Sequence, residues 1–430
     1  DLDSALAYLA GHVDLEREVA PSAASRRLDR VRRLVELMGD PQRAYPVIHI
    51  TGTNGKGSVA RMVTALLTAR GLRAGTYTSP HLERVNERLA WDGEPIPDDE
   101  LAEVIGAVAE LEPLLGSPPT HFEILTTAAF RWFADVAVDV AVVEVGLGGR
   151  WDATNVADGQ VAVVTNVSLD HAETIGPALS DIAREKAGIV KPESTLVLAE
   201  TSPRLLPIFE TAGAAETWVR DSHFACGSNL MAHEGRVVDL RTPGATYEGV
   251  YLPVHGRYQG DNAAVALAAV EAFFGAPLVP EVVAEAFAGL RLPGRLEVLS
   301  RHPLCVLDGA HNPAGALAAM EAVDEAFGPV TSGRILVVGM LQGRDPVEML
   351  HCLDAAHARL VVACPPPSPR ALPAAEVADA ARDLGTDAEV ADSVAEAVAT
   401  ALALAGEQEL VHVTGSLYVV GAARAALHRA

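Results

Sequence analysis

The sequence predicts an α/β protein with a larger N-terminal domain built on a mostly parallel sheet and a smaller, doubly wound C-terminal domain. Short, strongly apolar runs alternate with helical stretches along the whole chain. Runs this apolar are typical of strands covered by helices on both faces, as in parallel sheets. A chain of 430 residues also exceeds one ordinary core, so two domains are expected.

The elements of the first domain follow from two periodicities. Strongly apolar segments predict buried strands at residues 47–50, 138–145, 161–164 and 195–198. Alanine and leucine at helical spacing predict helices over residues 59–70, 98–111 and 262–274. Between Trp218 and Pro253, polar residues alternate with valine and tyrosine, which predicts antiparallel strands.

The pattern breaks at Leu292-Pro293-Gly294-Arg295, and a new alternation of strands and helices follows. Buried strands are expected at residues 305–307, 335–338, 360–363 and 410–413, with alanine-rich helices between them. This order predicts a Rossmann-like second domain. We therefore expect the domains to span residues 1–295 and 296–430.

The net charge and the use of cysteine limit the classes of binding partner and the cellular compartment that fit this protein. The net charge of −24 disfavours binding to nucleic acid or to an anionic membrane. Four scattered cysteines without a C-x-x-C pair suggest neither a disulfide framework nor a zinc site. No apolar run approaches the roughly 20 residues that span a bilayer, and Asp1-Leu2-Asp3 does not resemble a signal peptide. We expect a cytoplasmic protein with small-molecule partners.

The segment Thr51-Gly52-Thr53-Asn54-Gly55-Lys56-Gly57-Ser58 follows the first predicted strand and opens a helix. A strand, a glycine-rich turn and a helix in this order form a phosphate cradle, because backbone N–H groups and the helix N-terminus face the anion. Lys56 can reach the terminal phosphates, and the Ser58 hydroxyl can ligate Mg²⁺. Gly57 separates the lysine from the serine, unlike the usual pattern. The segment predicts a P-loop NTPase-like domain that binds a nucleoside triphosphate, with a purely structural turn as the lesser alternative.

Two further strands of this domain are followed by ionisable residues. Glu144 ends the most apolar strand, and Asp170-His171 come after the next one. Carboxyl ends of parallel strands face the ligand crevice, where Glu144 can bind Mg²⁺. The alternatives are a capping role for Glu144 and a structural hydrogen-bonding role for His171.

Lys186 lies on an unusual face of a predicted helix. It shares that face with the small or apolar residues Ile182, Ala183 and Ala187, whereas lysines normally occupy solvated faces. A side chain that snorkels to solvent near the helix C-terminus explains the position equally well or better. The residues alone therefore favour a structural role for Lys186.

The second domain carries its own polar strand end, Asp308-Gly309-Ala310-His311-Asn312-Pro313. Asp308 can hold a ribose hydroxyl or organise phosphate-binding groups, and Asn312 can equally cap the following helix. Arg295 at the domain junction can swing onto phosphates as the domains close, and Thr414-Gly415-Ser416 offers amides and a hydroxyl to a small anion. Two such domains facing each other predict phosphoryl transfer with domain closure.

These motifs, taken together, resemble the folylpolyglutamate synthase family, which includes bifunctional dihydrofolate synthases and belongs to the Mur ligase superfamily. The resemblance extends in order over nearly the whole chain. Its motifs are residues 51–58, Ser-Pro-His-Leu at 79–82, Phe-Glu-Ile-Leu-Thr at 122–126, and residues 144–155, 170–171, 185–189, 293–297, 308–313 and 415–418.

The resemblance implies an ATP-dependent amide ligase. The carboxylate of a pteroate or folate would attack the γ-phosphate of ATP, and the amine of L-glutamate would then attack the resulting acyl phosphate. Lys56 and two Mg²⁺ ions would neutralise the clustered anions, with Ser58 and Glu144 on one ion and His171 on the second. Lys186 matches a lysine that is carbamylated in this superfamily, which would make it a metal ligand and reverses the structural interpretation.

The resemblance also assigns the remaining contacts. ATP would meet Asn262, Arg295 and Asp308, while glutamate and phosphate would meet near His311 and Ser416. The pterin and pteroate side would comprise Ser79, His81, Phe122, Asp152 and Asn155.

Two positions depart from the family pattern. Tyr258-Gln259 stands where many relatives carry His-Gln, and Gln342-Gly343-Arg344-Asp345 replaces the usual Asp-Lys-Asp. Tyrosine can still stack on adenine, whereas arginine preserves the charge but not the geometry of lysine. The alternatives are a Mur-type ligase with another acceptor or amino acid, and a non-catalytic nucleotide-binding paralogue. We expect a monomer.

Overall fold

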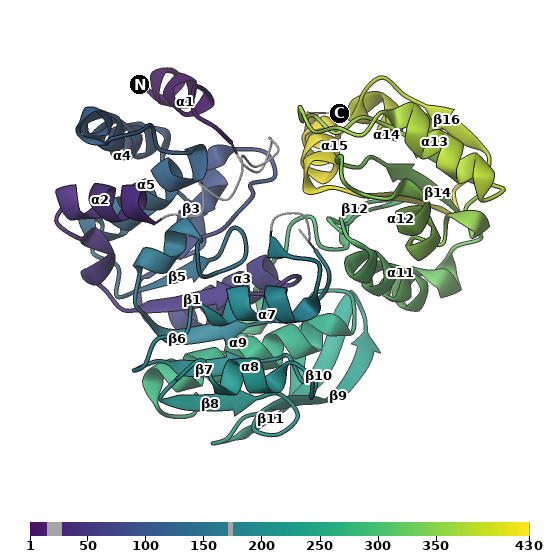
Figure 1. Ribbon diagram of the computed structural model, residues 1–430. Coiled ribbons are helices and arrows are strands. Elements are labelled where there is room, and N and C mark those ends of the chain that lie inside the picture. Colours follow the sequence, from purple (N-terminus) through teal and green to yellow (C-terminus); the bar gives the residue numbers. More distant parts are fainter. Residues whose placement is uncertain (15–27, 171–174, 430) are drawn as a thin grey trace.

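A computed structural model describes residues 1–14, 28–170 and 175–429 of the protein (Figure 1). The N-terminal part is built on an eight-stranded sheet in the order β4-β3-β2-β5-β1-β6-β7-β8. Six of its strands are parallel: β1 (Val47–Thr51), β2 (Ala74–Tyr77), β5 (Val140–Glu144), β6 (Gly159–Val164), β7 (Thr195–Leu198) and β8 (Glu216–Val219). Two short antiparallel strands, β3 (Leu89–Trp91) and β4 (Glu94–Pro95), form one edge. The predicted mostly parallel sheet is confirmed, with β1 at its centre.

Helices cover both faces of this sheet because successive side chains of each buried strand point to opposite sides. One face packs against α3 (Lys56–Ala69), α9 (Tyr258–Phe274) and α10 (Pro280–Ala288). The other face is covered by α1 (Leu2–Ala10), α2 (Asp29–Leu37), α4 (Asp98–Leu111), α5 (His121–Asp135), α7 (Leu179–Ala187) and α8 (Leu206–Glu210). Short 3₁₀ turns complete this part: η2 (Pro41–Arg43), η3 (Val85–Arg88), η4 (Glu112–Leu114) and η5 (Ala153–Val156).

A separate three-stranded antiparallel sheet packs beneath α9. It contains β9 (Ala225–Ala232), β10 (Gly235–Arg241) and β11 (Thr246–Leu252), in the region where antiparallel strands were predicted. The first residues of that region differ from the prediction, because β8 joins the large sheet in parallel beside β7. Apolar Trp218 packs against the core there, and this long-range pairing overrides the local alternation.

The C-terminal part forms a six-stranded sheet in the order β12-β13-β17-β14-β15-β16. Its strands are β12 (Glu297–Arg301), β13 (Leu304–Leu307), β14 (Gly333–Val338), β15 (Leu360–Ala363), β16 (Ala388–Val390) and β17 (Glu409–Thr414). Only β12 pairs in the antiparallel sense. The helices α11 (Pro313–Phe327), α12 (Pro346–Cys352) and α13 (Ala374–Asp383) cover one face, and α14 (Val394–Leu404) and α15 (Leu417–Arg429) the other, with turns η6 (Gly328–Val330) and η7 (Ala355–His357).

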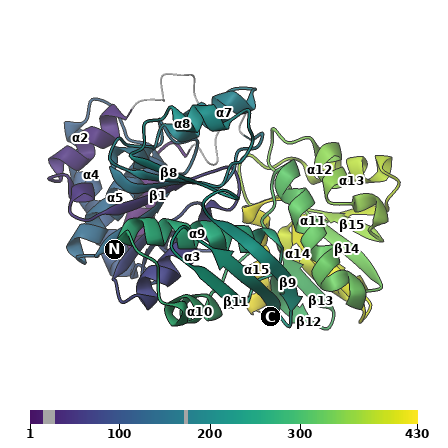
Figure 2. The same ribbon diagram turned by 90° about the horizontal axis from the view of Figure 1, so that it is seen from below.

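The two parts touch through the small sheet as well as through the site described below. In Figure 2 the strands β9 and β11 lie beside α11, β12 and β13. Arg236 on β10 is buried and bonds Glu325 on α11 at 2.6 Å, while the rings of His255 and Phe327 meet edge to face. Among the described residues, no helix has both the length and the apolar character that a membrane crossing requires.

Candidate functional site

The predicted phosphate loop joins the end of β1 to the start of α3 and is held from behind by the segment after β6. The Asn54 N–H donates to Asn166 Oδ1 at 2.9 Å, and the Thr165 hydroxyl donates to the Asn54 carbonyl at 2.6 Å. A Cβ on Gly52 would lie 1.7 Å from Thr165 Oγ1, so this close approach requires glycine. Lys56 Nζ lies across the loop and donates to the carbonyls of Gly52 and Thr53. These contacts hold the loop between the end of β1 and the segment after β6.

Glu144 lies at the end of β5, beside the first turn of α3. A Cβ on Gly57 would approach Glu144 Oε2 to 3.6 Å, and Ser58 is buried in the same turn. Glu144 Oε2 accepts a hydrogen bond from the Ser79 N–H at 3.1 Å. Burial raises the pKa of Glu144, and the positive charges of Lys56 and Arg61 are among the groups that oppose this rise. The pair Ser58 and Glu144 thus offers two oxygen ligands next to the phosphate loop.

Lys186 is buried on the inner face of α7, with only 4% of the residue exposed. Burial, and then the charge of Lys56, lower the pKa of Lys186 to about 7. Asp170, Glu185 and Asp152 act in the opposite direction. The snorkelling interpretation is wrong, because the side chain is enclosed by the fold rather than extended to solvent.

Asp170 lies in the segment after β6 and contacts three residues of the C-terminal part. Its carboxylate lies 2.7 Å from Arg344 Nη2 and accepts from Asn312 Nδ2 at 3.1 Å, while His311 Nε2 lies 3.7 Å away. The neighbouring His171, a predicted metal ligand, lies outside the described residues. Arg344, which departs from the family pattern, therefore has a defined partner across the domain junction.

Asn312 combines the capping and contact roles that the sequence left open. Its Oδ1 caps α11 by accepting from the Gly315 N–H at 2.8 Å. Its amide also exchanges hydrogen bonds with the side-chain amide of Asn54, at 2.9 and 3.2 Å. Because Asn54 belongs to the phosphate loop, the second domain docks directly on that loop.

The residues predicted to contact the nucleotide gather at the junction of α9 and β12. A Cβ on Gly55 would lie 2.9 Å from Asn262 Oδ1, which brings α9 against the phosphate loop. Asp308 is buried and accepts hydrogen bonds from the Leu296 and Ala310 N–H groups. Burial raises the pKa of Asp308, and the positive charge of Arg295 opposes this rise.

Tyr258 begins α9 and packs against the core of the C-terminal part. Burial, and then the charge of Asp308, raise the pKa of its hydroxyl, which therefore remains protonated. The tyrosine that departs from the family pattern thus lies within electrostatic range of Asp308, on the predicted nucleotide side.

The residues predicted for the acceptor side lie around the glycine-rich segment after β5. A Cβ on Gly146 would be 2.6 Å from the Phe122 ring, whose centroid is 5.9 Å from that of Tyr77. His81 Nδ1 accepts from Arg88 Nε at 2.9 Å, which orients the imidazole. Ser79 reaches the site through its N–H bond to Glu144.

Asp152 and Asn155, also predicted on the acceptor side, are engaged by the protein itself. Asp152 accepts from the Leu147 N–H at 2.9 Å and from the Thr154 hydroxyl at 2.5 Å, and burial raises its pKa to about 6. The Asn155 amide donates to the carbonyls of Arg150 and Gly188. These contacts show both side chains shaping the loop over residues 146–155.

In the C-terminal part, Ser416 and His311 lie at adjacent strand ends. Ser416 is buried and its hydroxyl accepts from the Tyr418 N–H at 3.1 Å, at the start of α15. His311 Nδ1 lies 3.0 Å from the Gly309 carbonyl oxygen, and its other nitrogen faces Asp170. The parallel strands β13 and β17 pair directly, and this pairing brings the two segments together.

Sequence reasoning missed Arg61 and Asn166. Arg61 is half-buried on α3, and its positive charge opposes the rise that burial causes in the pKa of Glu144. A single arginine inside the apolar run Val59-Ala60-Arg61-Met62-Val63 was the available signal. Asn166 comes two residues after the buried strand β6 ends at Val164, and that position was its signal.

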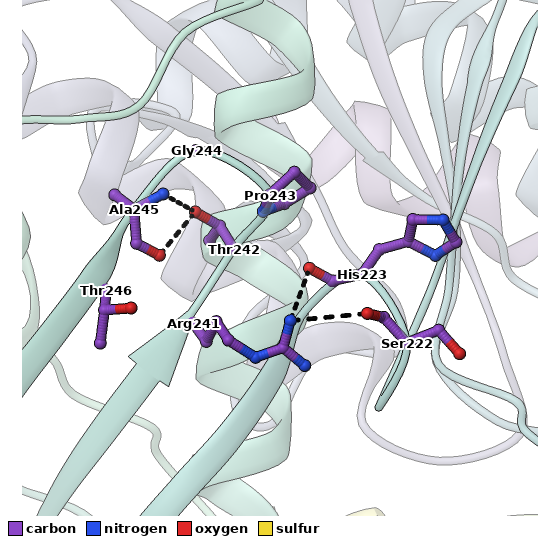
Figure 3. Close-up of a pocket in the computed structure, with 8 residues that line it drawn as sticks. All are labelled: Ser222, His223, Arg241, Thr242, Pro243, Gly244, Ala245 and Thr246. Atoms are coloured by element: carbon purple, nitrogen blue, oxygen red, sulfur yellow. Dashed lines mark hydrogen bonds between the residues drawn. The ribbon is translucent and has the colours of Figure 1, made fainter.

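A separate cavity of about 540 Å³ lies between the β8–β9 connection and the β10–β11 hairpin (Figure 3). Arg241 donates there to the carbonyls of Ser222 and His223. None of the predicted site residues lines this cavity.

Replacing Arg344 with alanine is expected to loosen the docking of the second domain. The change removes a cation from a carboxylate whose side chain is only 5% exposed, which costs about 2–5 kcal/mol of docking free energy. Small-angle X-ray scattering should show a larger radius of gyration than for the wild type. Arg382→Ala is the control, since Arg382 pairs with Asp379 inside one helix. An equally compact Arg344→Ala protein would contradict the docking role.

Comparison with known proteins identifies relatives over the whole chain. The family model described as "Mur ligase middle domain" matches residues 50–270, and "Mur ligase, glutamate ligase domain" matches residues 294–417. A dihydrofolate synthase/folylpolyglutamate synthase of Mycobacterium tuberculosis is 42% identical over 78% of this chain and 73% of its own length. A folylpolyglutamate synthase of Lacticaseibacillus casei is 35% identical over 93% of this chain and 94% of its own length.

Solved structures agree with these relatives. Folylpolyglutamate synthase of M. tuberculosis, in crystals with ADP and AMPPCP, matches with a TM-score of 0.91 and 38% identity, covering 100% of both chains. E. coli FolC in complex with DHPP and ADP matches with a TM-score of 0.87 and 30% identity, covering 100% of this chain and 98% of its own.

Proposed function

The chain belongs to the folylpolyglutamate synthase/dihydrofolate synthase family of Mur ligases, and on that premise we propose that it joins L-glutamate to dihydropteroate, to a reduced folate, or to both. It is an ATP-dependent ligase. One observation carries the proposal: the second domain docks through Asn312 onto the phosphate loop, whose Lys56 acts electrostatically on both Glu144 and Lys186. Such a meeting of two domains can hold two substrates in the orientation that their reaction requires.

The proposed reaction has two steps. The acceptor carboxylate attacks the γ-phosphorus of ATP, ADP leaves, and an acyl phosphate forms. The glutamate amine then attacks the acyl carbon, loses a proton and expels phosphate from a tetrahedral intermediate. The protein must hold clustered anions together, and Lys56 and Arg295 with Arg61 supply positive charge around Glu144 for this purpose.

The residues at the phosphate loop fit a magnesium ion. Within the described ranges, no three His, Cys, Asp or Glu residues converge to enclose a metal. Mg²⁺ commonly takes only one or two protein oxygens and completes its shell with phosphates and water, so Ser58 and Glu144 are a suitable pair. When bound, the ion would offset phosphate charge. The relative solved with Mn, AMPPNP and L-glutamate supports a divalent metal here.

We propose that a second ion would be held by His171 and by Lys186 in carbamylated form. A carbamate forms when a neutral amine adds to CO₂ and releases a proton. Because burial lowers the pKa of Lys186 to about 7, a large fraction of the amine is neutral near physiological pH. The resulting anion would face Lys56, whose charge disfavours the ammonium form.

The acceptor is proposed to lie between Phe122 and the loop over residues 146–155, near Ser79 and His81. The complex of E. coli FolC with DHPP supports a pterin-bearing acceptor. On the nucleotide side we propose Thr53, Asn54, Gly55, Gly57, Asn262 and Asp308, and for glutamate and phosphate His311 and Ser416. We also propose a cytoplasmic monomer.

The purified protein should release phosphate only when ATP, Mg²⁺, L-glutamate and a pteroate or folate acceptor are all present. The proposed reaction predicts this requirement because the γ-phosphate is transferred to the acceptor, not to water. A coupled phosphate assay with each component omitted in turn measures it, and mass spectrometry should find the acceptor heavier by one glutamyl residue. Comparison of dihydropteroate with tetrahydrofolate assigns the acceptor. Turnover with peptidoglycan-type precursors instead would identify another Mur-type ligase, and no turnover with any acceptor would favour a non-catalytic paralogue.

A further inference from the structure

His49 lies inside the first domain on β1 and is fully buried. Its neighbours Ile48 and Ile50 point into the core beneath α3 and α9, so His49 points to the opposite face of the sheet. There its Nε2 lies 2.8 Å from the Thr154 hydroxyl. Burial, followed by the charge of Lys191, lowers the pKa of His49 to about 3, so the ring is neutral.

The hydrogen-bond directions follow from the neighbouring carboxylate. The Thr154 hydroxyl donates to Asp152 Oδ1 at 2.5 Å, so it accepts the hydrogen on His49 Nε2. The other nitrogen, Nδ1, is buried and has no hydrogen-bond partner within the described ranges. The fold thus leaves one nitrogen of a buried imidazole unpaired while the other holds Thr154.

The bond to Thr154 is one of two side-chain hydrogen bonds that join β1 to the loop over residues 146–155. Thr51, also on β1, donates through its hydroxyl to the Gly148 carbonyl at 2.7 Å. Thr154 in turn orients Asp152, which also accepts from the Leu147 N–H. Both ends of the loop are therefore tied to one strand.

The same strand ends in the phosphate loop. β1 thus sets two things at once: where the phosphate loop begins, and where the loop on the proposed acceptor side lies. An acceptor carboxylate attacks a phosphorus only when the two atoms approach to about 3–3.5 Å in the right orientation. A displacement of one loop relative to the other would spoil that approach.

We propose that His49 is a positioning residue which, through Thr154 and Asp152, holds the 146–155 loop in register with the phosphate loop. This inference rests on the proposed function, because it assumes that the 146–155 loop borders the acceptor. His49 does not touch the substrates; its effect passes through Thr154.

The test compares His49→Leu with His49→Gln. Leucine removes the donor, whereas the glutamine side-chain amide can still donate to Thr154. We expect His49→Leu to lower kcat/KM for the acceptor by about 10- to 100-fold, with the KM for ATP changed by less than about twofold. His49→Gln should recover most of the loss. His412→Leu is the matched control, because His412 is equally buried and has a pKa lowered to about 3, while its imidazole nitrogens hydrogen-bond no residue of the described chain.

Hydrogen exchange gives a readout that does not depend on turnover. Amides of residues 146–155 should exchange faster in His49→Leu than in the wild type, while those of the phosphate loop should keep their protection. Thr154→Val provides a second route if His49→Leu does not fold, and the double variant should be no worse than the worse single one.

Equal losses in His49→Leu and His412→Leu, or an unchanged loop exchange rate, would overturn the positioning role. An equal rise in the KM for ATP and in the KM for the acceptor would overturn it as well. A wild-type protein that turns over no pteroate or folate acceptor would overturn the proposed function instead, and the exchange experiment would still decide on the hydrogen-bond chain.

Discussion

Replacing Lys186 with alanine is expected to lower kcat about 10²- to 10³-fold without unfolding the protein. The reason lies in its surroundings: Lys186 is buried on α7 and its pKa falls to about 7. In the proposed form its carbamate supplies an anionic oxygen that the methyl group of alanine cannot replace. Small carboxylates such as formate or acetate should restore part of the activity, since they can occupy the vacated space with an oxygen anion.

Phosphate release measured with and without added carboxylate tests this prediction. Arg184→Ala is the control, because Arg184 lies on the same helix but is exposed and pairs with Asp181 at 3.1 Å, away from the site. That variant should lose little kcat. A fully active Lys186→Ala protein, or a crystal structure that shows a bare amine at Lys186 with Mg²⁺ bound, would refute the carbamate.

The same lysine makes a prediction about stability in bicarbonate-free buffer. Its pKa is about 7 in the folded protein and near its usual 10.5 in the unfolded chain. Between these values the unfolded state binds more protons, so the free energy of unfolding should rise with pH across this window. Lys186→Met should flatten that rise in urea titrations at pH 7, 8 and 9. A rise of the same size in both proteins would show that other groups cause it.

Glu144→Gln is expected to abolish most activity, with kcat lowered about 10²- to 10³-fold, while leaving the free energy of unfolding unchanged or higher. Glutamine keeps the shape and can still accept from the Ser79 N–H, but it removes the charge that would bind Mg²⁺ beside Ser58. Burial raises the pKa of Glu144, so its ionised form is disfavoured in the folded protein. As the pH rises from the usual pKa of a glutamate to the raised pKa of Glu144, the free energy of unfolding therefore falls. Glutamine does not ionise, so the variant avoids this loss.

The matched control is Glu271→Gln. Glu271 is also a buried glutamate with a raised pKa, but it bonds the Tyr247 hydroxyl at 2.5 Å. Activity as a function of Mg²⁺ concentration and urea unfolding should separate the two: Glu144→Gln should lose metal-dependent turnover, and Glu271→Gln should keep it. A Glu144→Gln protein with wild-type dependence on Mg²⁺ would remove Glu144 from the metal site.

Local patterns were enough for the central strands and for the phosphate loop. β1, β5 and β6 are buried on both faces, so their apolar runs are continuous and visible in the sequence. The edge strands β3, β4, β12 and β16 carry exposed or half-buried residues and no such run, and they were missed. The buried strand β2 was missed as well, because its sequence, Ala-Gly-Thr-Tyr, contains no apolar run. The predicted strand at residues 138–145 starts too early. Ala137 adopts a left-handed backbone conformation, and β5 begins only at Val140.

Lys186 illustrates the limit of local reasoning. Its helix face was evident from the spacing, but whether the amine reaches solvent depends on which residues cover that face. The charges of Asp170 and Lys56, far away in the sequence, decide its protonation together with burial. Only a resemblance to a family, not the local pattern, indicated a functional role.

The sequence by itself determined the α/β class, the phosphate loop after β1 and the identity of the polar residues at the strand ends, because these depend on neighbours along the chain. Tertiary structure alone decided that Asn312 docks on Asn54 across 258 residues and that Arg344 meets Asp170. It also decided that His49 reaches Thr154 across 105 residues. Such contacts form between elements brought together by sheet order and domain packing, and no periodicity within a segment encodes its distant partner.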